Sequence, residues 1–195
     1  MKKLSNFYKI SQVSEELKDR LRSLKLIKLS DGRFDVMGDV GFYYLRLTSL
    51  LEIPIRIRRV TGDFYCNGNQ LTTLEDAPER VDGGFLCYYN KLTTLKGAPK
   101  FVGGVFNCTW NNLTSLEGAP ERVGGSFYCY HNQLTTLEGA PKYIGGDFDC
   151  GYNQLTTLEG APKFVGGDFN CRFNHKRFTE EEVRKLVDVR GVVIA

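Results

Sequence analysis

The sequence predicts a solenoid, a stack of similar coils joined by parallel β-strands. Three series of residues carry this prediction, because each of them recurs every 21 residues along most of the chain. A fixed period of this length is typical of units that cannot bury their own apolar face and therefore stack on one another. The series run from Cys66 to Cys171, from Phe64 to Phe169 and from Asn69 to Asn174.

One complete unit, from Val123 to Tyr143, reads VGGSFYCYHNQLTTLEGAPKY. Phenylalanine and cysteine at positions i and i+2 predict a short strand with one inward face. Two leucines of the L-T-x-L segment are expected to point inward after the strand. The Ala-Pro pair opposes any helix on the return side, and the Gly-Gly pair is expected to provide positive φ at a tight corner.

The cysteines and asparagines are predicted to be structural. Equivalent atoms of stacked strands lie about 4.8 Å apart with parallel Cβ vectors, whereas a disulfide needs converging Cβ atoms about 3.8 Å apart. Free, buried thiols are therefore expected. The asparagine amides are expected to bond backbone groups where the chain bends. His131 and His175 have no ligand-like spacing to any cysteine, so neither a metal site nor a cofactor is predicted.

The chain divides into three predicted parts. An N-terminal cap with a helix, a short hairpin and a degenerate first repeat covers 1–59, six 21-residue repeats cover 60–174, and a helix and strand form a C-terminal cap over 175–195. Open solenoids need such caps, because the outermost coils would otherwise expose strand edges.

Helix and turn signals place the elements of the N-terminal cap. A helix is predicted from Ser11 or Ser14 to about Ser23, since either serine is a good N-cap. Strands are expected at 25–29 and 33–37, joined by an Asp-Gly turn.

The C-terminal cap begins with a capping box. Thr179 and Glu182 stand three residues apart and predict a helix that runs to about Val187. One last strand is expected from Val189 to Ile194.

Charge is distributed unevenly along the chain. Residues 1–60 hold 13 Lys/Arg against 7 Asp/Glu, a net of +6, and residues 61–174 hold 8 against 12, a net of −4. The acidic repeats argue against nucleic acid as a partner, and the mixed charges near the N-terminus are typical of a solvated helix face.

There is no run of about 18 apolar residues and no apolar signal-peptide core, so we expect no membrane contact and a cytoplasmic location.

The repeat F-x-C-x-x-N-x-L resembles the leucine-rich-repeat core L-x-L-x-x-N-x-L over about residues 60–174. Its length and its cysteine resemble short bacterial leucine-rich repeats, and L-T-x-L-x-G-A-P-x-x-V-G-G resembles repeat proteins encoded by bacteriophages and some bacteria. The chain departs from the pattern at Asp76, which replaces glycine, at Ile57, which replaces proline, and at 175–177. The resemblance implies a leucine-rich-repeat solenoid with a parallel sheet on the concave side and little or no helix on the convex side.

The positions that vary between units predict the binding surface. Residues between and after each Phe and Cys should face outward, and their tyrosines, tryptophan and asparagines resemble the composition of binding paratopes. The alternative is that strands favour aromatic residues and that rim rings pack between coils. The predicted partner-binding residues are Tyr65, Tyr88, Tyr89, Asn107, Trp110, Tyr128, Tyr130, His131, Asp149, Tyr152 and Arg172.

An acidic group adjoins this surface. Asp147, Asp149 and Asp168 are expected to face outward on neighbouring strands. Such carboxylates form either a solvated patch, partly neutralised by Arg172, or a site for a cation. The solvated patch is the favoured prediction.

No catalytic motif is present, so the sequence predicts a protein that is not an enzyme. We expect a protein-protein interaction module, a monomer or weak oligomer, and the resemblance implies a phage factor that blocks or sequesters a host protein. The alternatives are a structural or virion-associated protein and a glycan- or peptide-binding module. Six strands span roughly 24 Å. A face of this length offers less area than the ~800 Å² per partner of a standard interface, so a protein partner should also contact loops or the N-terminal cap.

Overall fold

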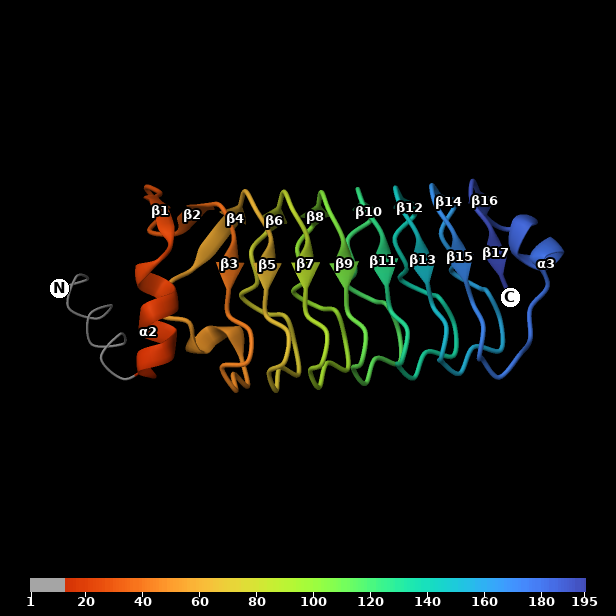
Figure 1. The fold of residues 1–195 in the computed structure, drawn as a ribbon, viewed down its shortest axis with the longest axis horizontal. Helices are drawn as coiled ribbons and strands as arrows, with labels where there is room; N and C mark the ends of the chain where they lie inside the picture. The colour runs from red at the N-terminus through yellow and green to blue at the C-terminus, as the bar shows by residue number, and fades with distance from the viewer. Residues whose placement is uncertain (1–12) are drawn as a thin grey trace.

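The chain forms a β-solenoid of about eight coils in a computed structural model, which describes residues 13–195 (Figure 1). Two sheets run along the stack, one of eight strands and one of nine. Helix is sparse in this part of the chain: α2 (Glu15–Arg22), the 3₁₀ turn η1 (Leu50–Glu52) and α3 (Glu180–Arg184). The prediction of a stack of parallel strands with little helix is therefore confirmed.

The eight-stranded sheet contains the predicted F-x-C strands. Its members pair in parallel without a shift of register in the repeats, so that Phe64 lies beside Phe85 and Phe85 beside Phe106. The strands are β3 (Val40–Gly41), β5 (Phe64–Tyr65), β7 (Phe85–Leu86), β9 (Phe106–Asn107), β11 (Phe127–Tyr128), β13 (Phe148–Asp149), β15 (Phe169–Asn170) and β17 (Val193–Ile194).

The nine-stranded sheet was not predicted. In β8, β10, β12 and β14 it uses the two residues that precede the Gly-Gly pair, of which the second is buried. Its strands are β1 (Lys25–Lys28), β2 (Phe34–Met37), β4 (Ile57–Val60), β6 (Arg80–Val81), β8 (Phe101–Val102), β10 (Arg122–Val123), β12 (Tyr143–Ile144), β14 (Phe164–Val165) and β16 (Asp188–Val189). The predicted N-terminal hairpin is confirmed, because β1 pairs with β2 antiparallel, and all later pairs are parallel.

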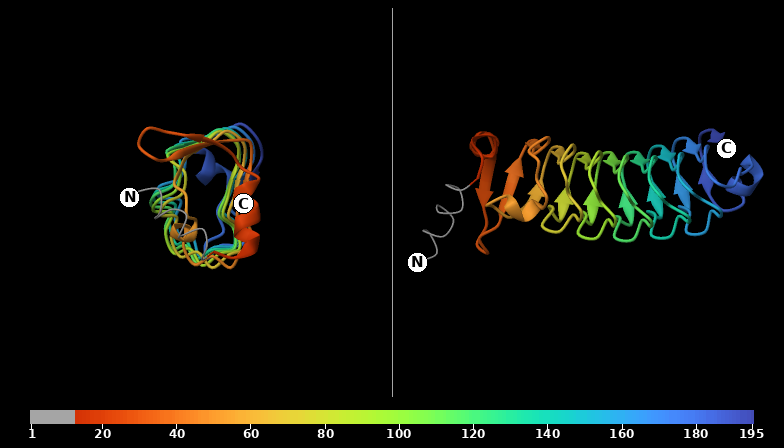
Figure 2. Two further views of the ribbon diagram at one scale, coloured as in Figure 1. Left: turned by 90° about the vertical axis from the view of Figure 1, so that its left-hand side faces the viewer. Right: turned by 90° about the horizontal axis from the view of Figure 1, so that it is seen from below.

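The second sheet explains the shape of the stack. Parallel strands fix a spacing of about 4.8 Å wherever they occur, so two sheets in every coil hold neighbouring coils equally far apart on both. The coils follow an almost straight axis (Figure 2). The face predicted to be concave is therefore flat along the stack.

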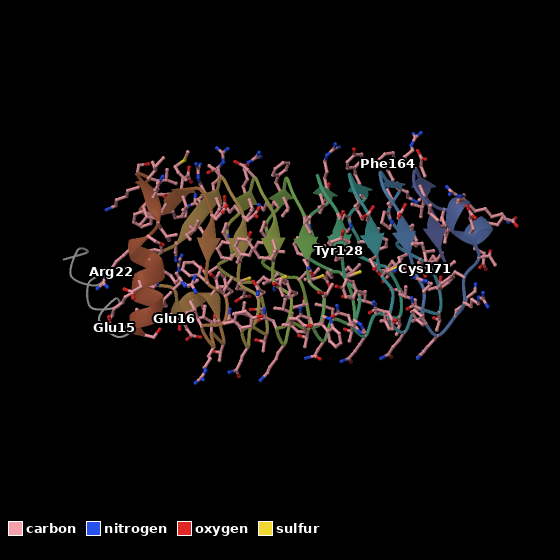
Figure 3. All side chains as sticks on the ribbon, in the orientation of Figure 1. Glu15, Glu16, Arg22, Tyr128, Phe164 and Cys171 are labelled. Carbon is pink, nitrogen blue, oxygen red and sulfur yellow. The ribbon has the colours of Figure 1, made fainter. Side chains whose placement is uncertain are left out.

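Aromatic rings and thiols fill the interior. Phe64, Phe85, Phe106, Phe127, Phe148 and Phe169 are at most 1% exposed, and consecutive ring centroids lie 5.0 to 6.0 Å apart. All six cysteines are free and buried, as expected of inward-facing thiols. Burial raises the pKa of each thiol, and that of Cys171, in the last repeat (Figure 3), reaches about 11.

The asparagine series has the predicted structural role. The Nδ2 of Asn111 donates to the carbonyl of Cys87 at 3.1 Å and to that of Cys108 at 3.0 Å. Its Oδ1 accepts from the N–H of Leu92 at 2.9 Å. Each asparagine thereby joins its own coil to the preceding one and satisfies backbone groups at the bend.

The predicted reason for the Gly-Gly pair is wrong. Positive φ occurs at the glycine of the G-A-P segment, such as Gly97 at 88°, and at Asp76, which takes the same position at 66°. The Gly-Gly corner has another requirement: a Cβ on Gly103 would lie 2.1 Å from the carbonyl oxygen of Asp82 in the preceding coil. Glycine is needed there because the backbones of adjacent coils approach closely.

Both predicted terminal helices are present. The Oγ of Ser14 accepts from the N–H of Leu17 at 3.2 Å at the start of α2, and Ser11 lies outside the described residues. Thr179 begins α3 with the expected capping box, but α3 ends at Arg184, earlier than predicted.

The last predicted strand, 189–194, is in fact two strands. β16 and β17 are separated by residues 190–192, and the N–H of Gly191 donates to the carbonyl of Gly167 at 3.0 Å. Gly191 thus occupies the corner position of the repeat. The coil pattern continues beyond residue 174, which the sequence does not reveal because the phenylalanine and cysteine are replaced.

Candidate interaction surface

The corner that follows the eight-stranded sheet has a left-handed backbone in each repeat. Five aromatic residues occupy it with φ between 51° and 58°, and Gly68 occupies the equivalent position at 66°. Left-handed φ costs a bulky residue about 1 kcal/mol, whereas glycine adopts it freely. We name these five residues the aromatic ladder: Tyr89, Trp110, His131, Tyr152 and Phe173.

The rings of the aromatic ladder form one continuous stack. Successive centroids lie 5.6, 3.9, 4.4 and 4.4 Å apart, and neighbouring planes differ by 20° to 24°. Trp110 is 44% exposed and Phe173 is 61% exposed. Because each inner ring is covered on its faces by its neighbours, the stack presents mainly ring edges to solvent.

Tyr44 extends the aromatic ladder toward the N-terminus. Its backbone is also left-handed, with φ of 55°, and its side chain is exposed. A Cβ on Gly68 would lie 2.2 Å from the Tyr44 ring, so this ring occupies the space that a side chain at 68 would fill. The sequence prediction missed Tyr44, which precedes Gly68 by 24 residues rather than 21.

Three tyrosines in or just after strands of the eight-stranded sheet contact the aromatic ladder or one another. Tyr88 meets Tyr89 edge to face at 5.6 Å, and Tyr130 meets His131 in the same way at 5.6 Å. Tyr128 lies 6.5 Å from Tyr130. The structure therefore brings most of the predicted aromatic residues into one connected surface.

Other predicted residues are engaged within the chain. The Oδ1 of Asn107 accepts from the N–H of Thr109 at 3.1 Å and from its hydroxyl at 2.8 Å. Tyr65 donates its hydroxyl to Asp63 at 2.8 Å, and this bond together with burial raises the pKa of Tyr65 to about 12. Arg172 is exposed and its guanidinium lies 5.8 Å from the ring centroid of Phe173.

The acidic residues of the predicted solvated patch accept hydrogen bonds from the backbone. Asp147 accepts from the N–H of Asp168 at 2.9 Å, and Asp168 accepts from the N–H of Val192 at 2.8 Å. Asp149 accepts from the N–H of Gly151 at 2.9 Å, while burial raises the pKa of its carboxyl. These carboxylates satisfy backbone amides at the corners of the coils.

Neither a metal centre nor a known relative identifies the function. No group of three or more His, Cys, Asp or Glu within residues 13–195 is arranged to hold a metal ion. The helices in that range are also too short and too polar to cross a membrane. No model of a known protein family matches the chain, and no curated protein matches it significantly. Functional inference therefore depends on the surface itself.

Proposed function

We propose that this chain is a non-enzymatic module that binds a protein through the aromatic ladder and the neighbouring Tyr88, Tyr128 and Tyr130. The supporting observation is the placement of five bulky rings at left-handed corners, where glycine would be unstrained. Ring stacking contributes about 0.5–1.5 kcal/mol per pair, which only offsets the strain of about 1 kcal/mol per residue. Stability of the fold therefore does not explain why bulky rings occupy these corners, whereas recognition of a partner does.

The orientation of the rings favours a protein over a glycan. The edges of aromatic rings carry partial positive charge and attract carbonyl oxygens, carboxylates and the faces of other aromatic rings. A sugar stacks on an exposed ring face, and in the aromatic ladder such a face is offered at the ends, as at Phe173.

The resemblance to leucine-rich repeats of phage and bacterial proteins extends the proposal. It supports a factor that acts in the bacterial cytosol by blocking or sequestering a host protein. It also supports capping roles for α2 and α3. In keeping with such a role, Arg184 of α3 donates to the carbonyls of Val189 at 2.8 Å and Gly191 at 3.0 Å. The equivalent carbonyls of the preceding coil accept from backbone N–H groups.

The test is capture of partners from bacterial lysate by the protein and by the double variant Trp110→Gly/Tyr152→Gly. Glycine removes both rings and suits the left-handed backbone, as Gly68 does, so the fold should persist. The matched control is Thr114→Ala/Thr135→Ala, which changes exposed residues of the L-T-x-L segment. We expect the first variant to lose its partner and the control to keep it. Unchanged capture by a folded glycine variant would contradict the proposal.

A structural or virion-associated role is the second candidate. It is favoured by the straight, regular stack, which suits a rigid spacer (Figure 2). This role requires the protein in purified virus particles, so mass spectrometry of virions separates the two candidates.

A further inference from the structure

The nine-stranded sheet carries a second stack of planar groups on its outer face. Arg80 lies beside Phe101 in the strand register, Arg122 beside Tyr143, and Tyr143 beside Phe164. The pairing of Val102 with Val123 brings Phe101 and Arg122 to neighbouring positions. The guanidinium of Arg80 is 3.9 Å from the ring centroid of Phe101, that of Arg122 is 3.7 Å from Tyr143, and Tyr143 stacks on Phe164 at 4.8 Å. We name these five residues the Arg–aromatic column.

A second row of exposed residues runs alongside the Arg–aromatic column, one position earlier in each unit. Backbone N–H groups in this row donate to the coil before, as Lys100 does to Glu79 and Lys163 to Lys142. The row consists of Glu79, Lys100, Glu121, Lys142 and Lys163, all of them exposed.

The cations of this face differ between its two ends. Near the N-terminal end they are neutralised within the chain: Arg33 pairs with Glu79, Arg58 with Asp35, and both Arg59 and Arg80 with Asp82. From β8 to β14 the exposed cations are not neutralised in this way. Lys100, Arg122, Lys142 and Lys163 form no ion pair with any residue in the range 13–195.

Stacking on Tyr143 prepares Arg122 to bind a carboxylate. The contact covers one face of the guanidinium and fixes its plane, so its N–H groups point out of the stack. A planar guanidinium with fixed N–H groups matches the two oxygens of a carboxylate and loses little freedom on binding. The lysines beside it add point charges, one on each of three coils.

We propose that the outer face of β8, β10, β12 and β14 binds an acidic, extended segment of a protein partner. The four unpaired cations span three coil steps, roughly 14 Å at about 4.8 Å per step. An extended chain advances about 3.3 Å per residue, so a segment of five or six residues rich in Asp or Glu covers this length. This surface is separate from the aromatic ladder, and its existence does not depend on the function proposed above.

One observation favours an acidic peptide over nucleic acid. Binding of single strands uses open aromatic faces on which bases stack, whereas the rings of Phe101 and Tyr143 are covered by guanidinium groups.

The experiment measures binding of three fluorescein-labelled probes at low ionic strength by fluorescence anisotropy. The probes are an octapeptide of alternating Glu and Ser, an octapeptide of Ser alone, and an eight-nucleotide oligothymidylate. We expect the acidic peptide to bind and the serine peptide not to bind. Absence of binding by the acidic peptide, or tighter binding of oligothymidylate, overturns the proposal.

Matched variants locate the site. Lys142→Gln/Lys163→Gln removes two charges from the proposed face and should weaken binding of the acidic peptide about tenfold. Lys91→Gln/Lys96→Gln removes two charges elsewhere and should change it less than about twofold; glutamine already stands at the positions equivalent to Lys91 in Gln70, Gln133 and Gln154. Equal weakening by both double variants overturns the proposal.

Two further measurements separate charge from folding. Arg122→Phe keeps a planar group in the stack, as Phe101 does, but removes the donors, and we expect about threefold weaker binding of the acidic peptide. Carbodiimide cross-linking of the unmodified protein to the acidic peptide requires no variant. Cross-links should form at Lys100, Lys142 and Lys163, and a preference for Lys91 and Lys96 overturns the proposal.

Discussion

Two stacks of aromatic rings run along this molecule with the same period, one inside the coils and one outside. The inner stack repeats phenylalanine without variation, on strands, with each ring at most 1% exposed. The aromatic ladder outside mixes tyrosine, tryptophan, histidine and phenylalanine on left-handed corners, and its rings other than His131 are 44% to 61% exposed. Their ring spacings are similar, so geometry alone does not distinguish them.

The difference lies in what surrounds each ring. An inner phenylalanine gains free energy from removal of its whole surface from water, about 25 cal/mol per Å². A ring of the aromatic ladder leaves much of its surface in water and also strains its backbone. The inner stack should therefore hold the fold together, and the outer stack should be almost dispensable for stability.

The largest expected effect comes from the inner stack. Phe106→Ala leaves a cavity between Phe85 and Phe127, whose rings lie 5.5 and 5.0 Å from that of Phe106. We expect the free energy of unfolding to fall by about 3–5 kcal/mol. Urea denaturation followed by circular dichroism measures this, and a loss below about 1 kcal/mol would contradict the assigned role of the inner stack.

Urea denaturation of variants in the aromatic ladder should show a smaller loss of stability, and the glycine variant should be more stable than the alanine variant. Trp110→Gly removes the stacking of Trp110 on Tyr89 and His131 but also relieves the left-handed strain, so the free energy of unfolding should change by less than about 1 kcal/mol. Trp110→Ala removes the same stacking and keeps the strain, so it should be about 1 kcal/mol less stable than the glycine variant. Equal stability of the two variants would show that the corner is not strained.

A third change tests the partly buried carboxylate on the outer side of the eight-stranded sheet. Burial raises the pKa of Asp149 above its ordinary 3.8, so the folded state holds this proton more tightly than the unfolded state does. Its contribution to stability is present below pH 3.8 and is lost as pH rises through the folded pKa.

Asp149→Asn should therefore gain melting temperature relative to the parent protein as pH increases from 3 to 7. Asparagine at this position is already used by the fold, since Asn107 and Asn170 accept from the backbone in the same way. A difference in melting temperature that is independent of pH would exclude Asp149 as its source.

The smallest effect concerns one phenol. The hydrogen bond to Asp63 and burial raise the pKa of Tyr65 to about 12, so its stabilising proton is fully bound below pH 10 and is lost between pH 10 and about 12. Alkaline titration of phenolate absorbance, compared with Tyr65→Phe, isolates this group. A difference curve centred near pH 10 would mean that the bond to Asp63 does not persist in solution.

Features that recur at a constant spacing could be predicted from the sequence, whereas the second strand of each coil could not. The F-x-C strands and the asparagine bonds follow from constant spacing and elementary geometry. The nine-stranded sheet does not, because a strand as short as Arg80–Val81 shows no alternation of apolar and polar residues. Its outer residues, including Arg122 and Tyr143, were consequently absent from the predicted surface.

The candidate site was predicted in composition but not in conformation. The 21-residue spacing places Trp110 and Tyr152 at one position of the coil, yet nothing in an aromatic residue signals positive φ. Gly103 was misinterpreted, and the backbone bonds of Asp147 were missed, for a related reason. Their roles depend on the neighbouring coil, whose backbone approaches to within bonding or clashing distance.

The buried cysteines give each repeat its own chemical reporter of opening. A thiol reacts with an alkylating reagent as thiolate, so a raised pKa and complete burial make reaction of Cys108 in the closed coil very slow. Each coil bonds only to its neighbours, and local opening in such an array spreads from coil to coil. The order in which the six thiols are modified under native conditions therefore maps where the stack first comes apart, coil by coil.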